Sequence, residues 1–185
     1  MRRACTLGPC YPRLVTNTAP LPGKPIAGSI TTMTELVLPT HANTLGTVFG
    51  GQVLAWIDLC AAICAQRHAG HQVTTAGIDD LSFERGVKVG EVVRVTACVT
   101  ATFRTSIEIR VAVDGEDARS GEHWPCVRAF VTFVAIDDEL RPVAVPQVIL
   151  ETAEQKRLAA DAADRRARRL ERRRSEEAIA AETAS

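Results

Sequence analysis

A single buried-helix pattern, followed only by strand patterns, is the feature that most constrains how this chain folds. Apolar residues recur at intervals of three and four from Gly50-Gly51 to about His68, and Gly70 ends the pattern. Strand patterns, either alternating or continuously apolar, surround it at residues 34–38, 73–83, 93–101, 107–113 and 127–136. One helix with a run of strands after it predicts an α+β fold, in which an antiparallel β-sheet wraps around a central α-helix.

Two tails of different composition flank this predicted domain. Residues 1–32 hold five of the nine prolines and lack an apolar period, so we expect a disordered N-terminal tail, with Met33 as a second candidate start. Residues 33–150 are expected to form the domain. Residues 151–185 contain no Pro or Gly and are rich in Ala, Glu and Arg, which predicts a solvated, charged helical C-terminal tail.

The C-terminal tail carries seven arginines between residues 165 and 174, which makes it a candidate contact for nucleic acid or an anionic surface. Acidic residues on either side nearly cancel this run, so we interpret it as an exposed charged helix. Over the whole chain, 22 Lys and Arg balance 22 Asp and Glu. No overall field therefore favours nucleic acid as a partner or an acidic substrate.

Cysteine usage and hydropathy indicate the compartment. Six cysteines are too thinly spread over 185 residues for a disulfide scaffold, which favours a reducing environment. Cys60 and Cys64 are four residues apart, which fits small core residues better than a metal site. No stretch approaches the roughly 18 consecutive apolar residues of a membrane span. We therefore expect a cytoplasmic protein without a membrane span and without a bound metal.

The segment from residue 41 to residue 58 combines an amide, a glycine pair and a carboxylate at fixed spacing: Asn43-x-x-Gly46, Phe49-Gly50-Gly51 and then Asp58. This spacing resembles the acyl-CoA thioesterase branch of the hotdog superfamily, which includes cytosolic acyl-CoA hydrolases. The likeness covers residues 33–146 and continues in these segments: Val73–Thr75, Ser82–Phe83, Val89–Val92, Arg104–Ser106 and Phe130–Val134. It implies a hotdog fold, hydrolysis of acyl-CoA to free fatty acid and coenzyme A, and no cofactor other than the coenzyme A of the substrate itself.

Asp58 is the first candidate catalytic residue. It shares a helical face with Leu54 and Ala61, where a carboxylate would lose its water. One interpretation is structural, a carboxylate satisfied by a backbone or hydroxyl partner. The functional alternatives are a general base for water or a nucleophile on the thioester carbonyl, and the sequence does not choose between them.

Gly51 and Asn43 are the other candidate catalytic residues. Gly50-Gly51 opens the helix and leaves backbone N–H groups at its positive end, which suits an oxyanion hole as well as a tight turn. Asn43 on its own would be a turn or cap residue. The resemblance implies that it acts in catalysis together with the Asp of a neighbouring domain or subunit. His41 lies close by, but the family pattern gives it no role.

We expect substrate contacts from a further set of residues that includes the first glycine of the helix: Gly50, Thr75, Phe83, Arg85, Arg104 and Ser106. Arg104 with Ser106 matches a place where the family contacts coenzyme A, whereas a hairpin arginine is otherwise solvated. Arg85 and Lys88 are candidates for phosphate contacts. Gly86 stands where the family usually has Pro, so this loop departs from the family pattern.

Three functions compete on this fold, and we favour hydrolysis. A hydratase or dehydratase would need a His beside the acyl chain, and the helix core contains none. An acyl-CoA-binding regulatory sensor would have no use for a buried base. Because Gly51 and Asp58 lie about 10 Å apart along a helix, one carbonyl cannot easily reach both. We therefore expect a homodimer or homohexamer (a trimer of dimers) with active sites shared between subunits. The acyl chain length is not readable from the sequence.

Overall fold

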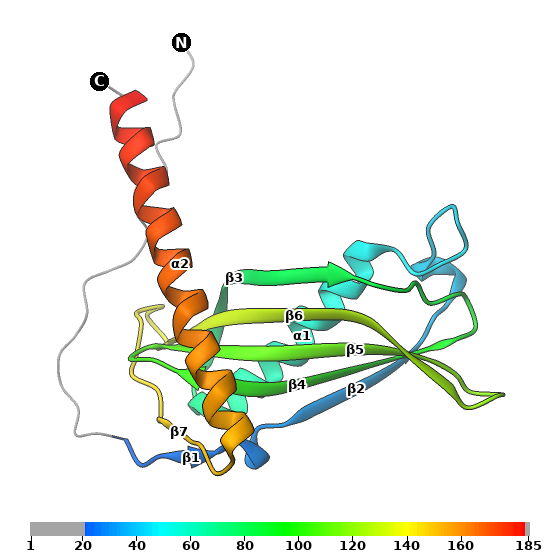
Figure 1. Ribbon diagram of the computed structural model, residues 1–185, viewed down its shortest axis with the longest axis horizontal. Coiled ribbons are helices and arrows are strands. Elements are labelled where there is room, and N and C mark those ends of the chain that lie inside the picture. The colour runs from blue at the N-terminus through cyan, green and yellow to red at the C-terminus, as the bar shows by residue number, and fades with distance from the viewer. Residues whose placement is uncertain (1–20, 184–185) are drawn as a thin grey trace.

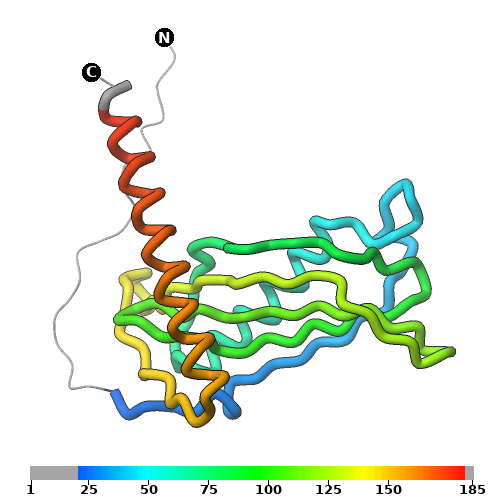
Figure 2. Tube along the Cα trace, in the orientation of Figure 1, coloured from blue at the N-terminus to red at the C-terminus, as the bar shows by residue number. Residues whose placement is uncertain are grey.

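The computed structural model describes residues 21–183 and contains one five-stranded antiparallel sheet. Its strands are β2 (Thr31–Leu36), β3 (Gln72–Phe83), β4 (Val92–Thr102), β5 (Ser106–Asp117) and β6 (Glu122–Ile136). Their order across the sheet is β2-β4-β5-β6-β3, as Figures 1 and 2 show. Strands β4, β5 and β6 form a meander. The two edge strands β2 and β3 flank helix α1 (Gly50–Ala69) in the sequence, so this helix carries the chain from one edge to the other.

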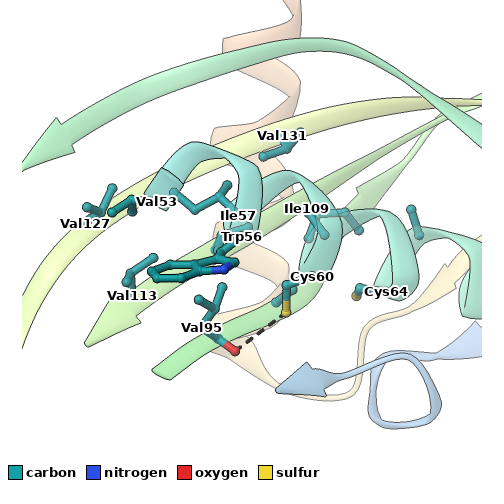
Figure 3. Packing of buried hydrophobic residues seen from close by; sticks show 14 of the residues in the cluster. Val53, Trp56, Ile57, Cys60, Cys64, Val95, Ile109, Val113, Val127 and Val131 are labelled. Carbon is teal, nitrogen blue, oxygen red and sulfur yellow. Dashed lines mark hydrogen bonds between the residues drawn. The ribbon is translucent and has the colours of Figure 1, made fainter. Parts of the chain in front are cut away.

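Helix α1 lies along one face of the sheet, and its apolar side forms the core. Ile57, Cys60 and Cys64 of the helix are fully buried, and Val95 and Ile109 of the sheet belong to the same cluster. Figure 3 shows these side chains between the helix and the strands. Full burial of a large aliphatic side chain contributes about 1.5–3 kcal/mol. The predicted α+β hotdog architecture is confirmed.

Gly70 ends α1 where the sequence pattern predicts. Its φ of 70° lies in the left-handed region, and its N–H donates a 2.8 Å hydrogen bond to Gln66 O. Glycine adopts this conformation without the steric cost of a Cβ atom. The helix therefore stops here and the chain turns into β3.

The described fold begins ahead of the predicted domain boundary at residue 33. Strand β1 (Lys24–Pro25) pairs in parallel with β7 (Val148–Ile149), and the 3-10 helix η1 (Ile26–Gly28) follows it. The predicted boundary also cuts through β2. Residues 21–32 are therefore corrected from disordered tail to part of the domain, whereas residues 1–20 of that predicted tail lie outside the described residues.

His68 holds this early segment against the end of α1, and its burial corrects the expectation that the helix core contains no His. Its ring is fully buried, with Nδ1 at 3.2 Å from Ser29 Oγ and Nε2 at 3.1 Å from Pro146 O. Desolvation by burial lowers the pKa of His68, which favours the neutral ring. A neutral ring with one donor and one acceptor nitrogen matches these two partners.

Helix α2 (Ala153–Thr183) crosses the opposite face of the sheet (Figure 1). Its Ala162 is fully buried, and Arg165 forms a buried ion pair with Glu108 of β5 at 2.7 Å. Thr100 donates a 2.7 Å hydrogen bond to the same carboxylate. The predicted solvated tail is therefore corrected over the first half of this helix, because Ala162 and Arg165 share a helical face that packs on the sheet.

Two further findings bear on cofactors and membranes. Across residues 21–183, no helix is long and apolar enough to cross a membrane, and no three His, Cys, Asp or Glu side chains cluster to hold a metal ion. The described cysteines, Cys60 and Cys64 among them, are free thiols. Burial raises the pKa of Cys64 to about 12, so this thiol acts as a small core residue.

Candidate active site

Asn43 closes a tight loop ahead of α1. Its Oδ1 accepts hydrogen bonds from the N–H of Leu45 at 2.9 Å and of Thr47 at 3.3 Å, and its Nδ2 donates to Thr47 Oγ1 at 3.0 Å. The backbone reinforces the loop, because the N–H of Asn43 donates to Thr47 O at 2.8 Å. In the single chain the amide thus fills the turn role expected of an Asn, and the loop fixes its position.

The first turn of α1 presents two backbone N–H groups. Phe49 O accepts the N–H groups of Gln52 and Val53, whereas the N–H groups of Gly50 and Gly51 donate to no acceptor within the described part of the chain. A Cβ atom on Gly51 would collide with the Phe49 ring. Free N–H groups at the positive end of a helix bind developing negative charge. This turn can therefore stabilise an oxyanion.

A pocket of about 250 Å³ lies beside the start of α1. It brings together four of the predicted site residues: Asn43, Gly50, Phe83 and Arg85. Much of its remaining lining is apolar and comes from the helix and the sheet, including Val53 and Cys126. Burial raises the pKa of Cys126 to about 11, so the pocket presents a neutral thiol. An apolar pocket with polar groups at one side is the usual setting of a small-molecule site.

Asp58 lies further along α1 and pairs with Thr75 of β3. The Thr75 hydroxyl donates to Asp58 Oδ1 at 2.7 Å, and the carboxylate is half-buried in the single chain. Oδ2 accepts no hydrogen bond from residues 21–183. The hydroxyl partner was the structural alternative for this Asp, but it occupies only one of the two oxygens. The other oxygen is available to a water molecule or a substrate.

Asp58 does not line the pocket beside the helix start. Seven helical residues separate it from Gly51, which is about 10 Å along the axis. Within one chain, the glycine N–H groups and the carboxylate therefore do not converge on one reacting atom.

Arg104 and Ser106 lie still further away, at the turn between β4 and β5. The pocket includes Val93 near the start of β4, whereas this turn follows the end of the strand. Ten residues of extended strand span about 33 Å. Arg104 is exposed, and its carbonyl accepts the N–H of Val145 at 3.1 Å. In the single chain these two residues belong to the opposite end of the sheet from the pocket.

Arg85 is held by acidic and aromatic neighbours. Its Nη1 lies 3.1 Å from Glu122 Oε1, and its guanidinium lies 4.2 Å from the centroid of the Trp124 ring. The next residue, Gly86, allows a close approach, because a Cβ there would lie 3.3 Å from Thr47 Cγ2. The loop that departs from the family pattern thus packs directly against the Asn43 loop. Lys88 is exposed, and its backbone N–H donates to Glu91 Oε2 at 2.7 Å.

His41 and Thr47 contribute more to the site than sequence reasoning assigned to them. His41 Nδ1 accepts the Leu38 N–H at 3.3 Å, its carbonyl accepts the Phe49 N–H at 2.8 Å, and its ring meets Trp56 edge-on. His41 thus joins the 3-10 helix η2 (Pro39–His41) to the start of α1. In the sequence, the one indication that His41 belongs to the site was its position two residues before Asn43. Spacing alone does not specify its contacts to Leu38 and Trp56.

Comparison with known proteins places this geometry in a family context. Residues 45–122 match the Thioesterase superfamily. The chain is 43% identical over 138 residues to the mouse protein named acyl-coenzyme A thioesterase 11, which covers 75% of this chain. It spans only 23% of the length of that relative.

Solved structures match over most of their length. A hexameric acyl-CoA thioesterase, solved in its apo form, superposes with a TM-score of 0.79 at 41% identity, covering 82% of this chain and 97% of that chain. A second match is an acyl-CoA hydrolase from Staphylococcus aureus, solved in complex with butyryl coenzyme A, coenzyme A and coenzyme A disulfide. It superposes with a TM-score of 0.81 at 34% identity, and the match covers 89% of this chain and 100% of that chain. Three variants of the S. aureus hydrolase, in which an Asp, a Thr or an Asn is replaced by alanine, each superpose with a TM-score of 0.78.

Proposed function

The chain belongs to the Thioesterase superfamily, and from that premise we propose that it hydrolyses acyl-CoA thioesters to a free acid and coenzyme A. The observation that carries the proposal is the pair of Asp58 and Thr75, in which one carboxylate oxygen is fixed and the other is open. Coenzyme A enters as part of the substrate and leaves as product. The butyryl coenzyme A and coenzyme A bound by the similar S. aureus hydrolase support this substrate class.

We assign Asp58 the role of general base. Its free oxygen takes a proton from water as the water oxygen bonds to the thioester carbonyl carbon, and the glycine N–H groups bind the resulting oxyanion. Collapse of that intermediate breaks the carbon–sulfur bond, and the departing thiolate takes up a proton. Thr75 positions the carboxylate by holding Oδ1. Asn43 lies at the pocket, where its loop can orient the substrate or the water.

The spacing of the substituted residues in the S. aureus hydrolase supports these roles. In that chain fifteen residues separate the substituted Asn from the Asp, and seventeen separate the Asp from the Thr. The same two intervals separate Asn43, Asp58 and Thr75 here.

The first test replaces the two members of the pair separately. We expect Asp58→Asn to lower kcat by about 10²–10⁴-fold, and Thr75→Val to lower it less because the carboxylate remains. Asp138→Asn, an exposed aspartate on the loop after β6, is the matched control. The readout is release of free thiol from a panel of acyl-CoA chain lengths. If the wild-type protein binds acyl-CoA tightly but hydrolyses none of the chain lengths, it is an acyl-CoA sensor and not an enzyme.

A second test separates a general base from a nucleophile. During turnover in ¹⁸O-labelled water, a general base leaves the Asp58 carboxylate unlabelled and the product acid labelled. Mass spectrometry of the peptide that contains Asp58 reads this out. Label in that carboxylate would show that it had formed a covalent acyl intermediate.

We further propose that each active site combines the pocket of one subunit with Asp58 of another. A base and an oxyanion donor must both lie about 3 Å from the reacting group, whereas Gly51 and Asp58 of one chain are about 10 Å apart along α1. The hexameric assembly of a similar thioesterase supports an oligomer. Whether this chain forms a dimer or a trimer of dimers, and its location in the cytoplasm, stay predictions.

Subunit mixing tests the shared site. Asn43→Ala and Asp58→Asn chains are each expected to be inactive on their own. Random exchange of equal amounts puts half of the chains in mixed dimers with one intact site of two, so activity should recover to about a quarter of wild type. Proven exchange without recovery would place both residues of each site on one chain.

A further inference from the structure

The pocket beside the start of α1 has a solvent-exposed mouth and an apolar floor. The residues of the mouth are exposed or only partly buried, and they include Asn43, Gly50, Phe83, Glu84 and Arg85. The residues of the floor are each at most 4% exposed: Val53, Val87, Val93, Val113, Cys126 and Val127. Figure 3 shows Val53, Val113 and Val127 together at one end of the core. The pocket therefore runs from the solvent into the space between α1 and the sheet.

Gly50 sets the direction in which a bound substrate enters. Its N–H lies at the mouth and donates to no acceptor within the described part of the chain. The exposed Phe83 ring lies over this glycine, because a Cβ atom on Gly50 would be 3.6 Å from Phe83 Cζ. If the Gly50 N–H holds a thioester carbonyl, the apolar space available to the acyl chain is the floor.

A β-bulge forms the end of the floor. In the register of β5 with β6, Val113 pairs with Val127. The next pair is Asp114 with Pro125, so Cys126 has no partner in β5. Neighbouring residues of a regular strand point to opposite faces, yet Cys126 and Val127 both line the pocket and both are buried. Bulges re-aim side chains in this way. The bulge therefore adds the Cys126 side chain to the floor.

The side chains of the floor offer no charged or strongly polar partner to the end of an acyl chain. They are five valines and one thiol. The Cys126 thiol contacts the carbonyl of Trp124 at 3.9 Å, and its raised pKa of about 11 keeps it neutral. Burial of a polar group without a hydrogen-bond partner is unfavourable. A terminal methyl group therefore fits this floor, whereas a terminal carboxylate does not.

The volume of the pocket limits the length of the chain. An apolar cavity of about 150 Å³ binds benzene, which has six carbon atoms. At the same volume per carbon, the pocket of about 250 Å³ holds about ten carbon atoms.

We propose that this pocket is the acyl-chain site and takes a methyl-terminated chain of about eight to ten carbons, with the bulge at Cys126 setting the upper limit of length. The inference rests on the proposed thioester hydrolysis and deepens it by naming the substrate class. Cys126 and Val113 contact the far end of the chain, whereas Asp58 acts at the thioester.

Binding of an acyl-CoA series to Asp58→Asn, measured by calorimetry, tests the length limit without turnover. From butyryl-CoA onward, we expect Kd to fall by about threefold to fourfold for each added methylene. The fall should end near decanoyl-CoA. Adipoyl-CoA should bind at least about tenfold more weakly than hexanoyl-CoA, because its terminal carboxylate would be buried without a partner. A Kd that keeps falling as far as palmitoyl-CoA, or one that does not depend on chain length, would overturn the proposal.

Two substitutions in the same Asp58→Asn background change the floor in opposite directions. Val113→Ala removes two methyl groups, so the longest chain that still gains affinity should lengthen by about one or two carbons. Cys126→Met adds a longer, flexible side chain, so this limit should shorten by about two carbons.

Val111→Ala is the matched control, because Val111 is equally buried in β5 but lies outside the pocket. It should leave the length limit unchanged. Circular dichroism checks that each variant is folded. An unchanged limit in folded Val113→Ala and Cys126→Met would also overturn the proposal.

Turnover of the same series by the wild-type protein separates the two proposals. If chains bind with the expected limit but none releases free thiol, the proposed hydrolysis fails and the acyl-chain site stands. If free thiol is released while binding shows no length limit, hydrolysis stands and the acyl-chain site fails. If no acyl-CoA binds at any length, both fail.

Discussion

Arg165 is a residue outside the candidate site whose loss we expect to weaken the fold strongly. Its guanidinium donates to both oxygens of Glu108, at 2.7 and 3.2 Å, and lies 3.6 Å from the centroid of the Phe130 ring. Glu108 is fully buried. The substitution Arg165→Met keeps much of the aliphatic packing but leaves this carboxylate with the Thr100 hydroxyl as its remaining side-chain partner.

The size of the loss follows from that burial. Removing one partner of a buried ion pair costs about 3–5 kcal/mol, because the other charge is left uncompensated. We therefore expect Arg165→Met to lower the free energy of unfolding by about 3–5 kcal/mol.

Urea unfolding followed by circular dichroism, at one fixed protein concentration, measures this loss. Arg157→Met, in an exposed position of the same helix, should cost under about 0.5 kcal/mol. The double variant Arg165→Met/Glu108→Leu should lie within about 1 kcal/mol of wild type, because no buried charge remains. Thr100 would still donate to the backbone carbonyl of residue 108 at 3.1 Å. A loss under about 1 kcal/mol in Arg165→Met would refute the reasoning.

Three further predictions concern the rest of the fold. Gly115→Ala should destabilise the protein by about 1–3 kcal/mol, because its Cβ would collide with the Trp124 indole; tryptophan fluorescence and urea unfolding report this, and a wild-type midpoint would contradict it. The lowered pKa of His68 means that the unfolded chain binds its proton more readily, so the unfolding free energy should fall as pH drops below about 6.5. This fall should be smaller in His68→Gln. An equal fall in the wild type and in His68→Gln would show that His68 is not its cause. Gly70→Ala should cost about 1 kcal/mol in thermal unfolding because of its left-handed φ, whereas no change would mean that the helix end relaxes.

The central helix and the sheet could be predicted because their apolar periods are local. The pattern that ends at Gly70 and the alternation in β4 and β5 depend only on neighbouring residues, and both match the structure closely. Strands β1 and β7 have two residues each and pair across more than a hundred positions. No local apolar period marks two strands this short, so the predicted start of the domain at residue 33 came after β1.

Glu108 shows why contacts on the outer face escaped prediction. In an alternating strand it takes the outward position, where a charge is normally solvated. Only the crossing of α2 buries it, and the composition of that helix predicts helix formation but not the face that packs. The candidate site divides in a similar way. The resemblance singled out Asp58 as a catalytic candidate and Thr75 as a substrate contact, but it could not show that they pair directly or that Arg104 lies at the opposite end of the sheet.

The strand order also has a consequence for synthesis on the ribosome. Helix α1 is complete at Ala69, but β4, β5 and β6, whose inner faces cover it, end only at Ile136. If translation adds roughly 5–20 residues per second, about 3–13 seconds pass between completion of the helix and synthesis of the last strand that covers its apolar face. During that interval the nascent chain exposes Ile57 and its apolar neighbours without a sheet to bury them. A chaperone that binds apolar helices should therefore associate with ribosome-bound chains arrested near residue 100 and release chains extended well past residue 136.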